Sequence, residues 1–351
     1  MNVKQPLINS RVVLLFITTL IALSVATVIA LQIGGAAKEL TLLDPGAFVR
    51  FGLPLSRALM DVAMATSIGA LVIAAFVFAE GDAKLRTTMN VAAGASVVWV
   101  ISGMLSLNFT YLNLTGLAFS LEQNYGAGFW QFATQIELGR YLLLNLVGGL
   151  LISILALVSQ RLTSAALTAV IGFLSLVPMA LTGHASGTAN HSMAVNSLGL
   201  HLLAIVIWVG GLIALSIVQL RRGVSQAEVT RYSGLALFSF ALVFVSGLIN
   251  AQLRIGTLAN WFTPYGLIVL LKIAALLVLG LIGAAYRRRL IAGLGAKPKA
   301  FWRLAAIELA VMAAAVGIGA AQPIITTCGK TANPESIECN KPNRRVVVSV
   351  Q

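Results

Sequence analysis

The sequence predicts an all-α integral membrane protein with about nine transmembrane helices. Of its 351 residues, 58% are hydrophobic and only 10% are charged, and the mean hydropathy is +0.92. An ordinary soluble domain carries about 25% charged residues, so a soluble chain of this composition would be unable to cover its surface. In a bilayer, lipid-facing residues need no charge, and each helix satisfies its own backbone. A multi-pass helical protein therefore accommodates this composition.

Nine apolar stretches are long enough to cross a hydrocarbon core about 30 Å thick. The first follows Lys4 and Arg11, as a signal peptide would. Its hydrophobic run is about twenty residues, longer than the roughly 7–15 of a signal peptide, so we expect a membrane anchor. The nine spans are expected at 12–33, 52–79, 90–110, 129–158, 163–183, 194–219, 232–253, 264–286 and 302–322.

The formal net charge of +13 is explained by topology. Most of the 24 lysine and arginine residues fall on one side of the nine-helix arrangement, among them Lys84, Arg221, Arg222 and the cluster Arg287–Arg289. Basic residues stay on the cytoplasmic side, so the N-terminus is expected inside and the C-terminus outside. The basic excess does not indicate a nucleic-acid partner. The expected location is the bacterial cytoplasmic (inner) membrane.

A short recurring motif divides the membrane part into two units. Ile101-Ser102-Gly103 in the third span resembles Val245-Ser246-Gly247 in the seventh, and each is followed by an outer loop with Tyr-Gly and a span with a buried cation. The second to fifth and sixth to ninth spans are then candidate parallel four-helix repeats, with the first helix as an addition. The expected units are an N-terminal helix and outer loop (1–44), a first four-helix unit (45–189), a second four-helix unit (190–323) and a polar tail (324–351).

The tail contains both cysteines of the chain, Cys328 and Cys339. On the outer side of the membrane they could form a disulfide. The ten residues between them match no metal or redox motif. A disordered tail, with or without that bridge, is the simpler interpretation.

Polar side chains inside predicted spans usually face a protein interior or a water path. From the helical rise, Asp61, Glu137, His201 and Lys272 are expected roughly 10–15 Å below the outer surface. Asn250 lies nearer to that surface on the seventh span. The polar layer therefore occupies the outer half of the membrane, and a site there would be loaded from the extracytoplasmic side.

A structural explanation is available for several of these charges. Arg57 is four residues from Asp61, and Arg140 is three from Glu137, so each pair can neutralise itself on one helix face. Glu308 lies nearer the cytoplasmic side and Lys272 nearer the outside, so direct pairing of the two is not expected. These two charges would then serve mainly to bind neighbouring helices.

All three histidines fall in one stretch of the chain. His184 and His191, the latter followed by Met193, flank the outer end of the sixth span, and His201 lies within it. Imidazole and thioether suit copper, and thioether favours Cu(I), whereas Mg²⁺ or Ca²⁺ would need oxygen-rich sites. His201, His184, His191 and Met193 are therefore the candidate metal ligands.

The alternative is that each histidine is an ordinary hydrogen-bonded or interfacial residue. Taken alone, that is the commoner role, and the ligand interpretation depends on all three converging on one side of the membrane. Met60 and Met64, one turn apart on the second span, are interpreted as packing residues.

From His201 onward the sequence resembles the copper resistance protein D (CopD) family. The segment from His201 to Gly211, with Trp208, looks like the opening of that domain, and the resemblance extends over roughly residues 190–323. The first half resembles the less characterised part of longer family members. Further matching positions occur in order: Arg231-Tyr232-Ser233, Ser246-Gly247, Asn250, Thr263–Gly266, Lys272, Arg287–Arg289, Arg303 and Glu308.

The resemblance implies copper transport or homeostasis, with copper moved inward from the periplasmic side. His201 is the best-supported position and His184 a weaker one. Copper, as Cu(I) or Cu(II), and the lipid bilayer are the implied partners, and an extracytoplasmic copper-binding protein is a candidate donor. No Walker A motif or ATPase-sized cytoplasmic loop occurs, so an enzyme is not expected and transport would be passive or ion-coupled.

Two other functions remain open. A membrane b-type haem protein needs two facing axial ligands, and one haem held by His184 and His201 near the outer surface would meet that need. A copper-related assembly scaffold without transport is the third interpretation.

Overall fold

The computed structural model describes residues 10–33, 37, 44–117, 123–181, 191–255, 261–289 and 298–320. Throughout these ranges the regular structure is helical and no strand occurs, so the predicted all-α class is confirmed. A π-helical segment, η2, joins α7 to α8 without a break. The elements are α1 (Ser10–Ile33), α2 (Ala47–Phe76), α3 (Ala83–Thr115), α4 (Gln123–Gln135), α5 (Glu137–Val158), α6 (Leu162–Leu181), α7 (His191–Ile205), η2 (Val206–Gly210), α8 (Gly211–Arg222), α9 (Gln226–Ile255), α10 (Pro264–Arg289) and α11 (Pro298–Ala320).

Seven helical segments are long and apolar enough to cross a bilayer, which makes this a multi-pass membrane protein. Each of the nine predicted spans overlaps helical structure, although the fourth covers parts of both α4 and α5. The first and ninth correspond to α1 and α11, whose apolar parts within the described residues, Ile17–Ile33 and Ala305–Ala320, are shorter than the others. The seven segments are Ala47–Phe76, Ala83–Thr115, Glu137–Val158, Leu162–Leu181, Ser192–Arg222, Gln226–Leu253 and Gly266–Ala285.

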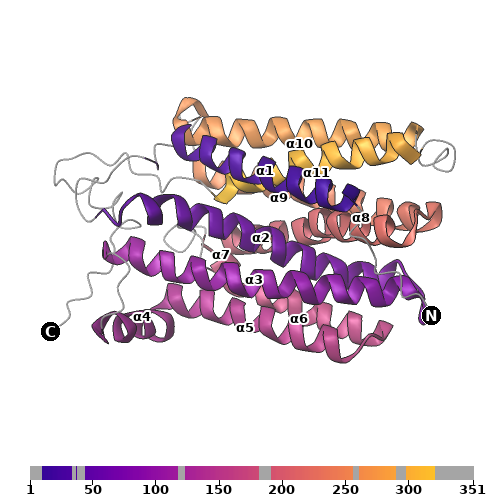
Figure 1. The fold of residues 1–351 in the computed structure, drawn as a ribbon. Coiled ribbons are helices and arrows are strands. Elements are labelled where there is room, and N and C mark those ends of the chain that lie inside the picture. Colours follow the sequence, from indigo (N-terminus) through magenta and orange to yellow (C-terminus); the bar gives the residue numbers. More distant parts are fainter. Residues whose placement is uncertain are drawn as a thin grey trace.

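The fourth predicted span, 129–158, is wrong at its start. The structure ends α4 and begins α5 on either side of Ile136, whose backbone is extended at φ −86° and ψ 133°. At this corner a Cβ on Gly139 would lie 2.1 Å from the carbonyl oxygen of Phe132. Glycine therefore permits a close turn, and α4 lies at one end of the bundle as a separate short helix (Figure 1).

Apart from α1 and α4, the helices form two groups of four, with α7–η2–α8 counted as one helix. In the N-terminal unit, α2 packs against α3, α3 against α5, α5 against α6, and α6 closes on α2. In the C-terminal unit, α7–η2–α8 packs against α9, α9 contacts α10, α10 contacts α11, and α11 closes on α8. The two units meet along α2, which also contacts η2, α8 and α11, while α1 packs against α11 (Figure 1).

The two ends of the bundle carry different residues. At the end drawn on the right in Figure 1, α2 ends, α3 begins with Lys84 in its first turn, and α8 ends with Arg221 and Arg222. We name it the basic end. At the opposite end α7 begins at His191 and α4 is placed, and we name it the histidine end.

The backbones of α2 and η2 touch where the two units meet. A Cβ on Gly210 would lie 1.7 Å from the carbonyl oxygen of Ala65, and one on Gly69 would lie 2.3 Å from the backbone of Gly210. Small residues that let helices approach this closely are typical of helix pairs in membranes. Nearby, the Tyr232 hydroxyl of α9 donates a hydrogen bond to the Trp208 carbonyl within η2. The π-helical segment is therefore held by α2 on one side and by α9 on the other.

Candidate metal site

His201 is on α7, about 15 Å along the helix from its first residue, and its side chain lies against α9. Its Nδ1 is 2.9 Å from the hydroxyl oxygen of Ser246 on α9. One turn nearer the histidine end, the Ser197 hydroxyl donates to the Ser246 backbone carbonyl at 3.1 Å. Two hydrogen bonds thus join α7 to α9 at a single serine, and they fix the imidazole against α9.

The same serine orients the imidazole. Ser246 Oγ lies 2.5 Å from the carbonyl oxygen of Leu242, a group that can only accept, so the hydroxyl donates its proton there. The hydroxyl oxygen is then placed to accept a hydrogen bond from His201 Nδ1. Metal-binding histidines commonly have this arrangement, because the hydrogen bond on one nitrogen orients the other toward the metal.

Two more residues of α9 border the imidazole or share its face. A Cβ on Gly247 would lie 3.4 Å from His201 Cε1, so this glycine leaves the imidazole room close to the α9 backbone. Asn250 follows Ser246 by four residues and therefore lies one turn further along the same face, where it is half-buried. The predicted position of Asn250 nearer the histidine end agrees with this geometry.

The other predicted ligands lie at the start of α7 or before it. His184 is outside the described residues. His191 is the first residue of α7, but its side chain is not described, and Met193 is 55% exposed. In the part of the chain that the structure describes, no three His, Cys, Asp or Glu side chains gather into a metal cluster. Of the four predicted ligands, His201 is the one whose side chain is half-buried and held between two helices in the described structure.

The predicted ion pair between Arg57 and Asp61 is not formed at contact distance. Both side chains lie on α2, where Arg57 Nη2 donates to Thr110 Oγ1 of α3 at 3.3 Å. Ion pairs within 4.0 Å do form elsewhere, for example Arg50–Asp44 and Lys84–Glu228. Arg57 turns to α3 because the threonine hydroxyl offers it a partner across the helix interface, so the acid and the base attract each other only over a longer distance.

Glu137 lies at the start of a helix and not several residues into one, as the predicted span 129–158 would place it. Because the chain breaks at Ile136, Glu137 is in the first turn of α5, at the histidine end, and both side chains are exposed. The Glu137 carboxylate accepts a hydrogen bond from the Tyr141 hydroxyl at 2.8 Å. These residues belong to the surface of the bundle end and do not form a polar layer with His201.

Aromatic side chains cover this end of the N-terminal unit. Tyr111 of α3 packs edge-on against Tyr125 and Phe129 of α4, and the Tyr125 hydroxyl accepts from Asn108 at 2.7 Å. Partial burial raises the pKa of Tyr125 above its ordinary value. Trp130 of α4 is 63% exposed. Such a belt is typical of a membrane–water interface, where amphipathic rings lie at the level of the headgroups.

Lys272 and Glu308 lie in different parts of the C-terminal unit. The Nζ of Lys272 reaches to 3.5 Å from the position of a Cβ on Gly319, which is about 16 Å along α11 from Glu308. Glu308 instead borders a mostly apolar cavity of about 190 Å³ between α8, α9, α10 and α11, which Gln219 also lines. The side chain of Lys272 and that of Glu308 therefore contact different parts of α11 and its neighbours.

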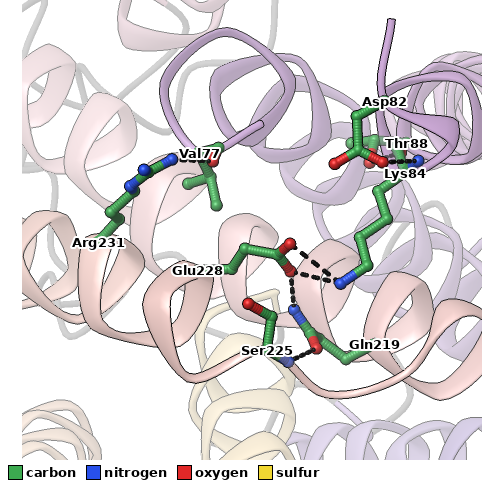
Figure 2. Close-up of polar contacts among 8 residues, drawn as sticks. All are labelled: Val77, Asp82, Lys84, Thr88, Gln219, Ser225, Glu228 and Arg231. Carbon is green, nitrogen blue, oxygen red and sulfur yellow. Dashed lines mark hydrogen bonds and ion pairs between the residues drawn. The ribbon is translucent and has the colours of Figure 1, made fainter. Parts of the chain in front are cut away.

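At the basic end a polar cluster joins the two units (Figure 2). Lys84 of α3 forms an ion pair with Glu228 of α9, with Nζ–O distances of 3.0 and 2.9 Å. The Gln219 amide of α8 donates to the same carboxylate at 2.5 Å, and its oxygen accepts from the Ser225 backbone N–H at 2.7 Å. Both charged side chains are about 15% exposed, at 15% and 14%. The pair is therefore largely shielded from water.

Two arginines add further links between the same elements. Arg231 Nη1 donates to the Val77 carbonyl at the end of α2 at 2.9 Å (Figure 2). Arg222 Nε donates to Thr87 Oγ1 of α3 at 2.8 Å. The basic side chains that indicate topology in the sequence thus also close the basic end, by hydrogen bonds from the C-terminal unit to the N-terminal unit.

Sequence reasoning missed three of these residues as functional partners. Ser246 was recognised as part of a recurring Ser-Gly motif and of the family resemblance, but not as a partner of His201, from which it is 45 residues away in the sequence. Glu228 and Lys84 are 144 residues apart. The one available signal was that Glu228 is an acid among basic residues at the start of its helix.

The fold and the site define a class: a multi-pass helical membrane protein of two four-helix units, with a half-buried histidine held by α9. The chain belongs to the copper resistance protein D family. Residues 226–322 match the model of copper resistance protein D, and residues 43–193 match the copper resistance protein D-like N-terminal domain. Comparisons with curated proteins and with solved structures found no match.

Family membership makes this a copper-handling membrane protein associated with copper resistance. The two matches cover most of the chain and leave out residues 194–225 between them, which include His201 and η2. The family match alone therefore assigns no ligand in that segment. A metal ligand among residues 194–225 is supported by the geometry around His201 and not by the family match.

Proposed function

We propose that the protein transports copper ions across the bacterial cytoplasmic membrane, taking them up from the extracytoplasmic side through His201. The observation that carries this proposal is the 2.9 Å contact between His201 Nδ1 and the Ser246 hydroxyl, because it holds a half-buried imidazole between two membrane helices. Imidazole in a mostly apolar helix bundle suits copper better than it suits a hard cation. Copper is the cargo in this proposal, and no catalytic step is assigned.

The charge distribution supports the direction. The basic end, with Lys84, Arg221 and Arg222, is cytoplasmic under the positive-inside rule, and the histidine end is then extracytoplasmic. In this orientation the N-terminus is inside and the C-terminus outside. The cluster around Glu228 ties the two units together at the cytoplasmic end, which fits a conformation that is loaded from the other side.

Exposed ligands near the mouth would pass the ion inward to His201. Met193 is exposed in the first turn of α7, within reach of an extracytoplasmic copper-binding protein. His191 precedes it by two residues in the sequence. His184 is a candidate for the same role by sequence. An ion would move from these exposed groups to a single half-buried imidazole.

The test compares His201→Ala with His191→Ala in cells that express the protein and are supplied with copper. His201→Ala is expected to lower copper accumulation to nearly that of cells without the protein, at unchanged protein abundance. His191→Ala is the matched control and should have a milder effect, because neighbouring exposed ligands can substitute. Wild-type accumulation in the His201→Ala strain would contradict the proposal.

The purified protein gives a second measurement, which also tests the two other functions. Copper bound without a Soret band agrees with transport, whereas a Soret band would establish a haem protein. Absence of both copper and haem would favour the scaffold. Copper binding should weaken as the pH falls, because the ligating imidazole must be unprotonated.

A further inference from the structure

Asp61 of α2 lies next to the point where the two units touch. It precedes Ala65 by four residues, so it is one turn, about 6 Å, nearer the histidine end on the same helix face. Ala65 is the residue whose carbonyl oxygen a Cβ on Gly210 would overlap. Counted from the histidine end, Asp61 is therefore the last charged side chain of α2 before this backbone contact.

The Asp61 carboxylate keeps accessible surface although α2 is the helix that joins the two units. Its side chain is half-buried, whereas Met60 and residues 63–65 are buried. Among the described residues it takes part in no hydrogen bond and in no ion pair within 4.0 Å, and its electrostatic partner is Arg57. Asp61 is also absent from the described side chains whose polar atoms are enclosed without a partner. Its oxygens therefore keep surface that water can reach.

Arg57 attracts this carboxylate without forming a contact pair with it. The guanidinium lies one turn nearer the histidine end and donates to Thr110 Oγ1 of α3 at 3.3 Å. Thr110 is buried, and its hydroxyl donates to the Ser106 carbonyl at 2.7 Å. A contact ion pair would strongly favour the charged acid. An arginine bound to a neighbouring helix leaves the acid able to gain and lose a proton.

The charged and titratable groups on the other helices packed against α2 lie elsewhere. Helix α6, η2 and residues 17–33 of α1 contain none. Tyr111 of α3 lies near the histidine end, and Glu308 of α11 borders the cavity inside the C-terminal unit. His201 of α7 faces α9. The remaining such residues on α1, α3, α8 and α11 lie toward the basic end: Arg11, Lys84, Arg86, Arg221, Arg222, Lys299 and Arg303.

We propose that Asp61 is a proton-binding site that couples copper uptake to proton entry. Ionisable side chains within membrane helices that face a protein interior commonly mark ion pathways and proton relays. A hard metal cation takes several oxygen ligands at once, whereas this face of α2 offers one carboxylate beside Ala65 and an arginine that repels cations. A proton needs only the carboxylate.

Asp61 and His201 lie on the same side of the contact between Ala65 and Gly210. His201 precedes Gly210 by nine residues on its own helix, and both helices run from the histidine end to the basic end (Figure 1). Two ions that load from the same side of one barrier cross it in the same direction. The inference rests on the proposed copper transport and deepens it, because each copper ion bound at His201 enters together with one proton carried by Asp61.

The protonated state of Asp61 can be tested without transport. A lipid-soluble carbodiimide reacts with a protonated carboxyl group and not with a carboxylate, and peptide mass spectrometry of the full-length purified protein locates the label. Asp61 is expected to be labelled near neutral pH, and labelling should decline as the pH is raised. Glu137, which is exposed on α5, is the internal control and should stay unlabelled. Absence of label on Asp61, or labelling that does not vary with pH, would overturn the inference.

Coupling is tested in proteoliposomes that enclose a pH-sensitive dye, with Ag(I) added outside as a redox-inert substitute for Cu(I). In the parent protein, silver entry should acidify the interior. Asp61→Asn removes the titrating carboxyl and nearly keeps its size, so acidification should fall to the level of protein-free vesicles while equilibrium Ag(I) binding stays unchanged. Glu137→Gln is the matched control and should acidify the interior as the parent does.

The outcomes separate this inference from the transport on which it rests. Silver entry without acidification in the parent, or equal acidification in Asp61→Asn, would overturn the coupling. Loss of Ag(I) binding in Asp61→Asn would overturn it as well, because Asp61 would then support the metal site directly. If no silver enters through the parent while Asp61 is labelled in the expected pH-dependent way, the proposed transport is refuted and the proton-binding site stands.

Discussion

The imidazole of His201 donates a hydrogen bond to the hydroxyl of Ser246, 2.9 Å away on the neighbouring membrane helix. The direction of this bond is set by the serine's own bond to the carbonyl four residues earlier. The side chain of one helix is thus oriented by the backbone of another. A histidine held in this way has a fixed orientation before any metal binds.

Replacing Ser246 with alanine should impair copper binding without removing the imidazole. The ring would lose the acceptor on Nδ1, and loss of such a supporting hydrogen bond typically lowers metal affinity about 10–100-fold. Ser239→Ala is the matched control, because that serine is buried on the same helix and its hydroxyl has no hydrogen-bond partner within the described structure. Copper titration of the purified variants checks this. Equal affinities would mean that Ser246 does not support the site.

Breaking the ion pair at the basic end should destabilise the contact between the two units. Lys84→Met leaves the Glu228 carboxylate largely shielded from water and without its cation, at an expected loss of about 1–3 kcal/mol, somewhat less than for a fully buried pair. Lys84→Met combined with Glu228→Gln should cost less than the sum of the single changes. Arg86→Met, an exposed change on the same helix, should be neutral. Unfolding in detergent measures all four variants, and strict additivity would show that the pair is not coupled.

Gly210→Ala should disrupt the join between α2 and η2. The added Cβ would lie 1.7 Å from the carbonyl oxygen of Ala65, and backbone cannot move aside as a flexible side chain can. The expected loss of stability exceeds the roughly 1–3 kcal/mol that is typical of overpacking. Gly234→Ala on α9 meets nothing within 4 Å and should be tolerated. Size-exclusion profiles and thermal unfolding of both variants test this prediction. Equal stability of the two variants would mean that α2 and η2 do not touch at Gly210.

Reporter fusions should confirm the orientation of the bundle. A reporter after Gly223, between α8 and α9 at the basic end, is expected in the cytoplasm. A reporter after Leu117, which comes just after α3 at the histidine end, is expected outside, as is one after Gln351. If the fusions at Gly223 and Leu117 report the same side, the assigned topology is wrong.

The helices themselves were predictable because a membrane span needs a long apolar run, and such runs are visible in the sequence. The corner at Ile136 was not predicted, because the polar residues of 129–158 near it, such as Gln135 and Glu137, were read as side chains within one continuous span. The close approach of Gly139 to Phe132 is visible only in the structure. That error also misplaced Glu137, whose depth had been counted along a continuous helix. Depth estimates fail wherever a helix bends.

The candidate site was predictable only in part. The histidines could be found because the chain has just three. Their partners could not, since the contact of His201 with Ser246 depends on how α7 packs against α9, and one buried serine resembles another in sequence. The same limit applies to Lys84 and Glu228, where many basic residues were available to pair with one acid. Pairing across helices is decided by packing and leaves little trace in local sequence.

The π-helical segment η2 determines how the α7 half of the helix is rotated relative to the α8 half about their common axis. A π turn bonds to the fifth residue instead of the fourth, so it acts as one extra residue in an α-helix and rotates the residues beyond it by about 100°. Before the turn the helix aims His201 at Ser246, and after it aims Gln219 at Glu228. Deleting one residue from Val206–Gly210 would therefore rotate one half of the helix relative to the other. Either His201 or Gln219 would then point away from its hydrogen-bond partner.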